Sequence, residues 1–183
     1  MTGPRICLLG HSGAGKSTTA GLIHAALAAR QISCAVVKVA APLYELQHSF
    51  YARLGEPLPP GQQDQQLLEA TAGWIRARRP MFLVEDFLAR AAATHADALV
   101  NDDIRSYDID YPELRARGWT AVRISTHGDL RAKRLAAQGY VSLSDASTAG
   151  VETVDVDHEI CNDGALDELA AAVHELIDGM LRC

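Results

Sequence analysis

Eight residues near the start of the chain could bind a polyphosphate. Residues 10–17 read Gly-His-Ser-Gly-Ala-Gly-Lys-Ser, which is a glycine, four residues and then Gly-Lys-Ser. Glycines let such a loop wrap around phosphate oxygens, because its backbone N–H groups must point inward. We expect Lys16 to reach the β- and γ-phosphates of a nucleotide and the Ser17 hydroxyl to hold Mg²⁺. The expected nucleotide-binding residues are Gly10, His11, Ser12, Gly13, Ala14, Gly15, Lys16, Ser17 and Thr18.

Two carboxylates and an arginine follow a short apolar run at residues 98–100. Asp103 could hold Mg²⁺ or orient an acceptor, as could its neighbour Asp102. Arg105 could bind a phosphate or a base edge through two parallel hydrogen bonds. The alternative is that the aspartates only end a strand and that Arg105 pairs with one of them at the surface. We expect catalytic roles for Asp103 and Arg105 and a metal-binding role for Asp103.

Two further groups of arginines could neutralise phosphate charge. The first is Arg76, Arg78 and Arg79, of which Arg76 is the preferred ligand of an acceptor phosphate. The alternative is that all three are solvated residues favoured by the helix dipole. Arg131 and Arg134 lie one helical turn apart and could stabilise a transferring phosphoryl group, or they could belong to a solvated helix face.

The segment from residue 40 to residue 50 could border an acceptor site. Pro42 is well placed to open a helix, and Tyr44, Gln47 and Phe50 then fall near one side of it. We expect Ala41, Pro42 and Tyr44 to contact the acceptor. Core packing is the preferred role for Phe50.

Apolar periodicity predicts the elements that would position these residues. We expect strands over residues 5–9, 32–39, 98–100, 119–124 and 158–161, the second of them buried on both faces. We expect helices over residues 18–30, 42–54, 62–77, 81–95, 111–118, 129–138 and 166–181. Strands that alternate with helices predict a three-layer α/β/α fold of the P-loop NTPase class, with a five-stranded parallel sheet.

Ligands of such sheets bind beyond the carboxyl ends of the strands, which places the phosphate loop and residues 40–43, 101–105 and 125–127 along one edge. The whole chain, residues 1–183, is predicted to be one domain. Residues 139–155 are rich in Ser, Thr, Ala and Gly, have no clear period and are predicted to form a small lid.

Bulk composition excludes several classes of protein. The net charge of −6 and the absence of a basic run argue against nucleic acid or a membrane surface as the partner. The four cysteines form no CxxC pair, so we expect neither a disulfide framework nor a zinc site, and a cytoplasmic location. Neither a signal peptide nor a membrane span is predicted. The expected partner is a phosphorylated small molecule, and a homodimer is one assembly that we consider.

The sequence resembles the deoxynucleoside monophosphate kinases of the phage type along nearly its whole length. The residues that carry this resemblance are the phosphate loop, Val39-Ala40-Ala41-Pro42-Leu43, Asp103-Ile104-Arg105, residues 144–151 and the stretch Asn162-Asp163-Gly164-Ala165-Leu166-Asp167-Glu168-Leu169. The resemblance implies transfer of the ATP γ-phosphoryl group to a nucleoside monophosphate. It implies Asp103 and Arg105 at the acceptor or metal, an arginine of residues 76–79 at the acceptor phosphate, and Arg131 or Arg134 near the transferring group.

The departures from that family lie on the acceptor side. Tyr44 stands where the family usually has a lysine, Ser147-Thr148 stands where it commonly has a Ser-Glu pair, and the chain is short between the second and third strands. We therefore expect an ATP- and Mg²⁺-dependent kinase of a nucleoside monophosphate or a close phosphate or phosphonate analogue. One alternative is a kinase of another small metabolite, such as a phosphomevalonate-like substrate or one with a hydroxyl acceptor and Asp103 as the base. A nucleotide-dependent switch protein is the other.

Overall fold

Five strands form one parallel sheet in the computed structural model, which describes residues 3–104, 106–137, 148 and 150–182. The strands are β1 (Arg5–Leu9), β2 (Cys34–Val36), β3 (Ala98–Asn101), β4 (Thr120–Ser125) and β5 (His158–Cys161). Their order is β2-β3-β1-β4-β5, and every neighbouring pair is parallel. The predicted α/β fold with a five-stranded parallel sheet is therefore confirmed.

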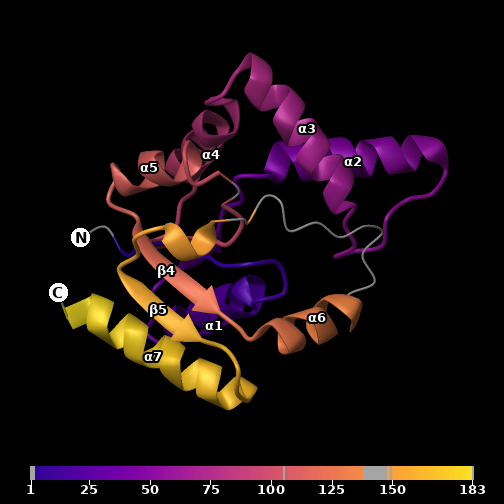
Figure 1. The fold of residues 1–183 in the computed structure, drawn as a ribbon. Helices are drawn as coiled ribbons and strands as arrows, with labels where there is room; N and C mark the ends of the chain where they lie inside the picture. The colour runs from indigo at the N-terminus through magenta and orange to yellow at the C-terminus, as the bar shows by residue number, and fades with distance from the viewer. Residues whose placement is uncertain (1–2, 105, 138–147, 149, 183) are drawn as a thin grey trace.

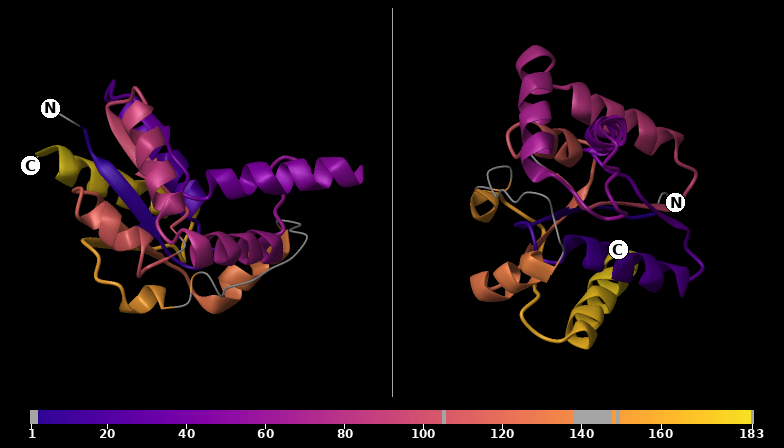
Figure 2. Two further views of the ribbon diagram at one scale, coloured as in Figure 1. Left: turned by 90° about the horizontal axis from the view of Figure 1, so that it is seen from above. Right: turned by 90° about the vertical axis from the view of Figure 1, so that its right-hand side faces the viewer.

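Helices cover both faces of the sheet (Figures 1 and 2). The helices α1 (Lys16–Ala28) and α7 (Leu166–Arg182) lie on one face, and α4 (Phe82–Ala93) and α5 (Asp110–Arg115) lie on the other. Successive side chains of a strand point to opposite faces. Ile6 and Leu8 of β1 accordingly pack with α1 and α7, whereas Cys7 and Leu9 pack in the second core with α4 and α5. These two cores hold the central strand rigidly beneath the phosphate loop.

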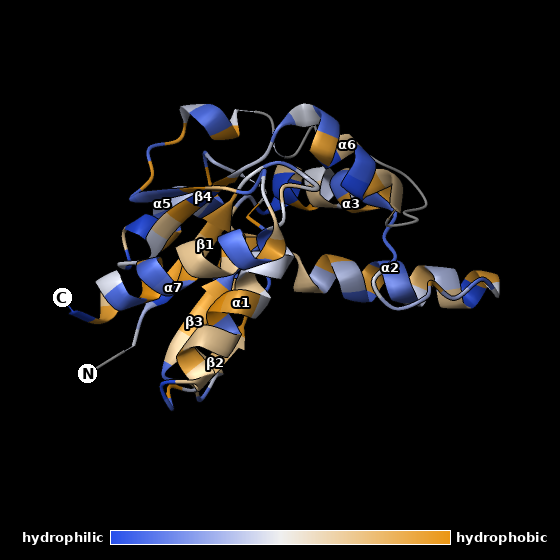
Figure 3. Cartoon of the chain, turned by 90° about the horizontal axis from the view of Figure 1, so that it is seen from below, coloured by the Kyte–Doolittle hydropathy of each residue, from blue (hydrophilic) through white to orange (hydrophobic). Residues whose placement is uncertain are grey.

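Two of the three helices between β2 and β3 lie at the side of the sheet toward which the strands point. They are α2 (Ala41–Leu54) and α3 (Gln65–Arg78), and α2 extends away from the body of the molecule (Figure 3). Pro42 stands in the first turn of α2, and Gly55 ends the helix with a φ of 78°. The helix α6 (Gly128–Ala137) follows β4 on the same side. None of the helices in the described ranges is long and apolar enough to cross a membrane.

Two predictions about packing are wrong. The second strand is Cys34–Val36 rather than residues 32–39, and it is not buried on both faces, because it forms an edge of the sheet and Val36 is 41% exposed. Phe50 is not in the core but 49% exposed. The cause is the direction of α2, which extends away from the sheet and so leaves Phe50 in its second half uncovered.

The predicted lid at residues 139–155 falls largely outside the described residues. Its described end contains a short 3₁₀ helix, η2 (Val151–Thr153). The backbone after η2 is anchored near β4, since Arg123 donates to the carbonyl of Val154 and Tyr111 donates to that of Asp155. This end of the segment therefore lies at a fixed place next to the sheet.

Candidate active site

The phosphate loop joins the end of β1 to the start of α1, as its motif predicts. Two of its glycines are required by close approaches at positive φ. A Cβ on Gly10 (φ 148°) would lie 2.4 Å from the carbonyl oxygen of Ile124, and one on Gly15 (φ 103°) would lie 2.2 Å from Nδ2 of Asn162. Asn162 also donates to the carbonyl of Ala14 over 2.8 Å. Asn162, in the segment that follows β5, therefore holds the phosphate loop in its position.

The two reactive residues of the loop point to different partners. The Lys16 ammonium donates to the carbonyl oxygens of Gly10 over 2.7 Å and of His11 over 2.9 Å, so it lies across its own loop. The Ser17 hydroxyl donates to Oδ2 of Asp102 over 2.7 Å. The loop therefore presents a cation and a carboxylate-bound hydroxyl side by side.

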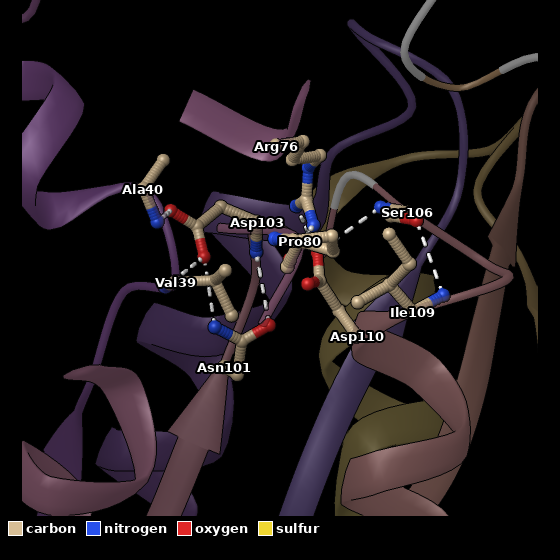
Figure 4. A network of polar contacts seen from close by, with 9 residues as sticks. All are labelled: Val39, Ala40, Arg76, Pro80, Asn101, Asp103, Ser106, Ile109 and Asp110. Carbon is tan, nitrogen blue, oxygen red and sulfur yellow. Dashed lines mark hydrogen bonds and ion pairs between the residues drawn. The ribbon is translucent and has the colours of Figure 1, made fainter. Parts of the chain in front are cut away.

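Asp103 has a structural position that differs from its predicted role at the metal. Its Oδ1 accepts hydrogen bonds from the backbone N–H of Val39 and the side-chain amide of Asn101, and its Oδ2 accepts from the N–H of Ala40 (Figure 4). The side chain is buried, with the residue 2% exposed. Asp103 thus fixes the junction between β2 and α2.

The carboxylate next to Ser17 belongs to Asp102 instead. Among the described residues, Asp102 rather than Asp103 contacts the Ser17 hydroxyl, so the structure places Asp102 where the sequence analysis expected Asp103. Neighbouring residues at a strand end point in opposite directions, so a shift of one position decides which carboxylate faces the loop. The sequence Asp102-Asp103 does not indicate which of the two carboxylates faces the phosphate loop.

Sequence analysis missed Lys38, which lies in the same site. Its Nζ atom is 2.5 Å from Oδ1 of Asp102, so this carboxylate binds Lys38 and Ser17 at once. A charged residue inside the apolar run of residues 32–39, at the carboxyl end of the strand, was the signal that could have indicated it.

A cavity of about 100 Å³ lies between the loop and these residues. It is lined by Ser12, Gly13, Gly15, Lys16, Ser17, Thr18, Lys38, Tyr44, Gln63, Gln65, Asp102 and Asp103. Most of these residues are polar or charged, as a site for phosphate and metal requires.

A second cavity, of about 280 Å³, adjoins the first. It is lined by Ala40, Leu43, Tyr44, Gln65, Leu68, Glu69, Ala72, Gly73, Arg76 and Ser106. Tyr44 and Gln65 line both cavities, so the two spaces meet at these side chains. The structure thus brings Tyr44 and Arg76 together at one cavity, as predicted for an acceptor site.

Two other residues expected near the acceptor, Ala41 and Pro42, do not line this cavity. Ala41 is not among the lining residues of this cavity, whose wall at that point is Ala40. Pro42 lines a separate groove between α2 and α3, together with Arg78 and Arg79. The reason is the helical turn, which points Pro42 away from the side that bears Leu43 and Tyr44. Arg105 lies outside the described residues.

Arg76 is held in its position by a buried carboxylate. Its Nη2 donates to Oδ2 of Asp110 over 2.7 Å, and the backbone N–H of Ser106 donates to the same oxygen over 3.1 Å (Figure 4). The side chain of Asp110 is fully buried, whereas that of Arg76 is 16% exposed. Oδ1 of Asp110 is buried without a hydrogen-bond partner among the described residues. Asp110 therefore links Arg76 to Ser106, and both of these residues line the second cavity.

The two arginines of α6 face different parts of the site. Arg131 donates to the carbonyl of Ser12 over 3.4 Å, so it lies against the phosphate loop. Arg134 donates to the carbonyl of Asn162 over 3.1 Å. It borders a third cavity, of about 370 Å³, which is lined by Gly13, Gly15, Thr18, Arg134, Ala137, Asn162, Gly164, Leu166 and Leu169.

His11 links the loop to the described end of the predicted lid. Its Nε2 forms an ion pair with Glu152, and its Nδ1 lies 3.2 Å from the hydroxyl of Thr148. The hydrogen bond with His11 lowers the pKa of the Glu152 carboxyl. The side chain of His11 thus joins the phosphate loop to the described end of the predicted lid.

Comparisons with known proteins support the fold. No family model matches the sequence, and no curated protein does. The structure is similar to the APS kinase CysC of Mycobacterium tuberculosis, solved with AMPPNP and APS (TM-score 0.55, 20% identity, 97% of this chain and 98% of that chain). It is also similar to shikimate kinase of Aquifex aeolicus (TM-score 0.55, 16% identity, 96% of each chain). A third similar structure is a gluconokinase of Sinorhizobium meliloti (TM-score 0.50, 17% identity, 99% and 97%). At these identities the likeness concerns the fold, which is that of the P-loop NTPases.

Proposed function

We propose that this protein is an ATP- and Mg²⁺-dependent kinase whose acceptor is a nucleoside monophosphate or a close phosphate or phosphonate analogue. The observation that carries the proposal is the junction of two cavities at Tyr44 and Gln65. One cavity contains the phosphate loop, and the other contains Arg76 among apolar residues. Two ligands bound there would meet end to end, which is what phosphoryl transfer requires.

The donor side suits ATP with a magnesium ion. The Ser17 hydroxyl and the Asp102 carboxylate offer the oxygen ligands that Mg²⁺ prefers. The described residues contain no group of three or more His, Cys, Asp and Glu side chains able to hold a metal, so the remaining ligands would come from phosphate and water. When bound, Mg²⁺ would neutralise phosphate charge. We place the adenine in the third cavity, beside the guanidinium of Arg134.

The acceptor cavity suits a nucleotide better than a polyol. Half of its lining is formed by small or apolar residues, which are Ala40, Leu43, Leu68, Ala72 and Gly73. Such a wall favours a planar base, while Arg76 offers a charged donor for a phosphate. An acceptor phosphate is already ionised at neutral pH and needs no general base.

A hydroxyl acceptor is the second candidate, because shikimate kinase and gluconokinase are among the similar structures. That reaction needs a base, for which the sequence offers Asp103. The carboxylate of Asp103 already accepts three N–H hydrogen bonds from the surrounding fold, so its oxygens are poorly placed to take a proton from a hydroxyl. This bonding favours the phosphate acceptor.

The test is ADP release from Mg²⁺·ATP with a panel of acceptors. The panel holds the common ribo- and deoxyribonucleoside monophosphates, modified pyrimidine monophosphates, phosphomevalonate, simple phosphonates, shikimate and gluconate. We expect stimulation by at least one nucleotide, and its loss in Lys16→Ala. Stimulation by shikimate or gluconate alone would establish the second candidate. Hydrolysis that no acceptor changes would indicate a nucleotide-dependent switch.

A further inference from the structure

Lys38 has no role in the function proposed above, although it lies in the phosphate cavity. It lies two residues beyond the end of β2 and lines that cavity together with Lys16, Ser17 and Tyr44. Its side chain is 35% exposed, whereas that of its partner Asp102 is 1% exposed. The ammonium therefore reaches from the open cavity to a buried carboxylate.

The backbone around Lys38 is fixed from three directions. The N–H of Val37 donates to the carbonyl of Val100 over 2.9 Å, and the N–H of Val39 donates to Asp103 over 2.7 Å. Between them, the carbonyl of Lys38 accepts a hydrogen bond from Arg90 over 2.7 Å. A long, flexible side chain thus starts from a rigid point, and it can change partners while its backbone stays in place.

The contact between Lys38 and Asp102 conflicts with the proposed metal site. A magnesium ion held by Ser17 and Asp102 would place two positive charges close to the Lys38 ammonium. Like charges at such short distances repel strongly in a partly buried site. Lys38 then has to leave Asp102, and the space that it already lines extends toward Tyr44 and Gln65, where donor and acceptor would meet.

We propose that Lys38 is a further catalytic cation, which rests on Asp102 in the free protein and moves to the transferring phosphoryl group when Mg²⁺·ATP binds. This inference rests on the proposed function. In the transfer, an oxygen of the acceptor phosphate forms a bond to the γ-phosphorus. The bond from that phosphorus to the β–γ bridging oxygen breaks, and its electron pair stays on the oxygen of ADP. Lys38 neutralises oxygen charge during this exchange and transfers no proton.

The simpler alternative is that Lys38 is only a counter-ion of Asp102. Both views predict that removing the lysine tightens binding of Mg²⁺ with ADP, since a competing cation is lost. The two views differ in the kcat that they predict for the variants at saturating Mg²⁺. If Lys38 is only a counter-ion, it has already left Asp102 and its removal does not change kcat. If Lys38 is a catalytic cation, its removal lowers kcat.

The experiment compares Lys38→Met with the matched variant Lys133→Met, whose lysine is exposed on α6. Lys38→Gln is the second variant, because its amide can still bond to Asp102 and preserve the fold. We measure kcat at saturating Mg²⁺, and by calorimetry the Mg²⁺ dependence of ADP binding without acceptor. We expect kcat to fall about 10²-fold in both Lys38 variants, as for the loss of one charge-stabilising donor. We expect half-saturation by Mg²⁺ to move to lower concentration in the Lys38 variants and not in Lys133→Met.

Three results would overturn parts of this scheme separately. If wild-type protein is active and kcat of the Lys38 variants stays within about twofold of Lys133→Met, Lys38 is not catalytic. If Mg²⁺ dependence of ADP binding is unchanged in the Lys38 variants, the exchange of cations at Asp102 is wrong. If wild-type protein shows no acceptor-dependent release of ADP, the proposed kinase function itself fails, and the role of Lys38 fails with it.

Discussion

The hydroxyl of Ser17 lies 2.7 Å from Oδ2 of Asp102, so the first turn of α1 and the carboxyl end of β3 meet at one hydrogen bond. The neighbouring carboxylate of Asp103 points the other way and binds the backbone of Val39 and Ala40. The two adjacent aspartates both line the phosphate cavity but have separate tasks, since Asp102 binds the Ser17 hydroxyl and Asp103 binds the backbone between β2 and α2.

Substitution of the two aspartates should separate these tasks. We expect Asp102→Asn to raise the Mg²⁺ concentration needed for ATP turnover while the melting temperature changes little. Asp103→Asn should lower the free energy of unfolding by about 1–3 kcal/mol, because its amide group would oppose backbone N–H donors. Mg²⁺ titrations of activity check the first prediction, and denaturant unfolding checks the second. The reverse pattern, with the Mg²⁺ requirement changed only in Asp103→Asn, would restore Asp103 as the metal ligand.

The glycine at the end of the loop gives a second prediction. Gly15→Ala should abolish binding of ATP and cost roughly 1–3 kcal/mol of stability, because φ is 103° and the new Cβ would meet Asn162 at 2.2 Å. Gly21→Ala is the matched control. No atom lies within 4 Å of its added Cβ and the residue is inside α1, so we expect a gain of about 0.5–1 kcal/mol. Calorimetric titration with ATP and thermal unfolding test the pair. Normal ATP affinity in Gly15→Ala would contradict the steric argument.

The parts of this molecule that were predictable from the sequence are those encoded by neighbouring residues. The phosphate loop is contiguous, and its strand and helix follow from local periodicity, so its place at the end of β1 was predicted correctly. Phe50 shows the limit of periodicity. Its spacing defines a face of α2, but whether anything covers that face depends on the direction of the helix in space.

Residues that meet from distant segments were harder to find. Arg76 and Asp110 are 34 positions apart, and only the fold brings them together in a buried ion pair. Lys38 and Asp102 meet in the same way, across 64 positions. In both cases the sequence analysis singled out one partner but not the pairing, because no local pattern relates two residues that lie so far apart in the chain.

The buried ion pair of Arg76 and Asp110 should control affinity for the acceptor. Asp110→Asn removes the charge that orients Arg76, so we expect KM for the acceptor to rise about tenfold with little change in KM for ATP. The control is Glu113→Gln on the same helix as Asp110, which breaks a surface pair with Arg117 just beyond the helix end and should change neither constant.

A double-mutant cycle distinguishes positioning from general destabilisation of the fold. In an Arg76→Ala background, Asp110→Asn should cause no further rise in KM for the acceptor, since the residue that it positions is gone. Additive effects of the two substitutions would contradict the positioning role. Thermal unfolding of each variant shows how much of the change comes from stability.

The ion pair of Glu152 with His11 predicts a dependence of stability on pH. Because the bond with His11 lowers the pKa of Glu152 in the folded state, the unfolded chain binds the proton more readily. The stabilisation is complete above the ordinary pKa of glutamate and is lost as pH falls through the lowered value. Wild-type protein should therefore be more stable than Glu152→Gln at neutral pH, by at most about 1 kcal/mol for so exposed a pair, and the two should converge in acid. Denaturant unfolding between about pH 7 and pH 3 measures the difference. In a His11→Gln background we expect Glu152→Gln to have no such effect, and a difference that persists there would assign it to a partner other than His11.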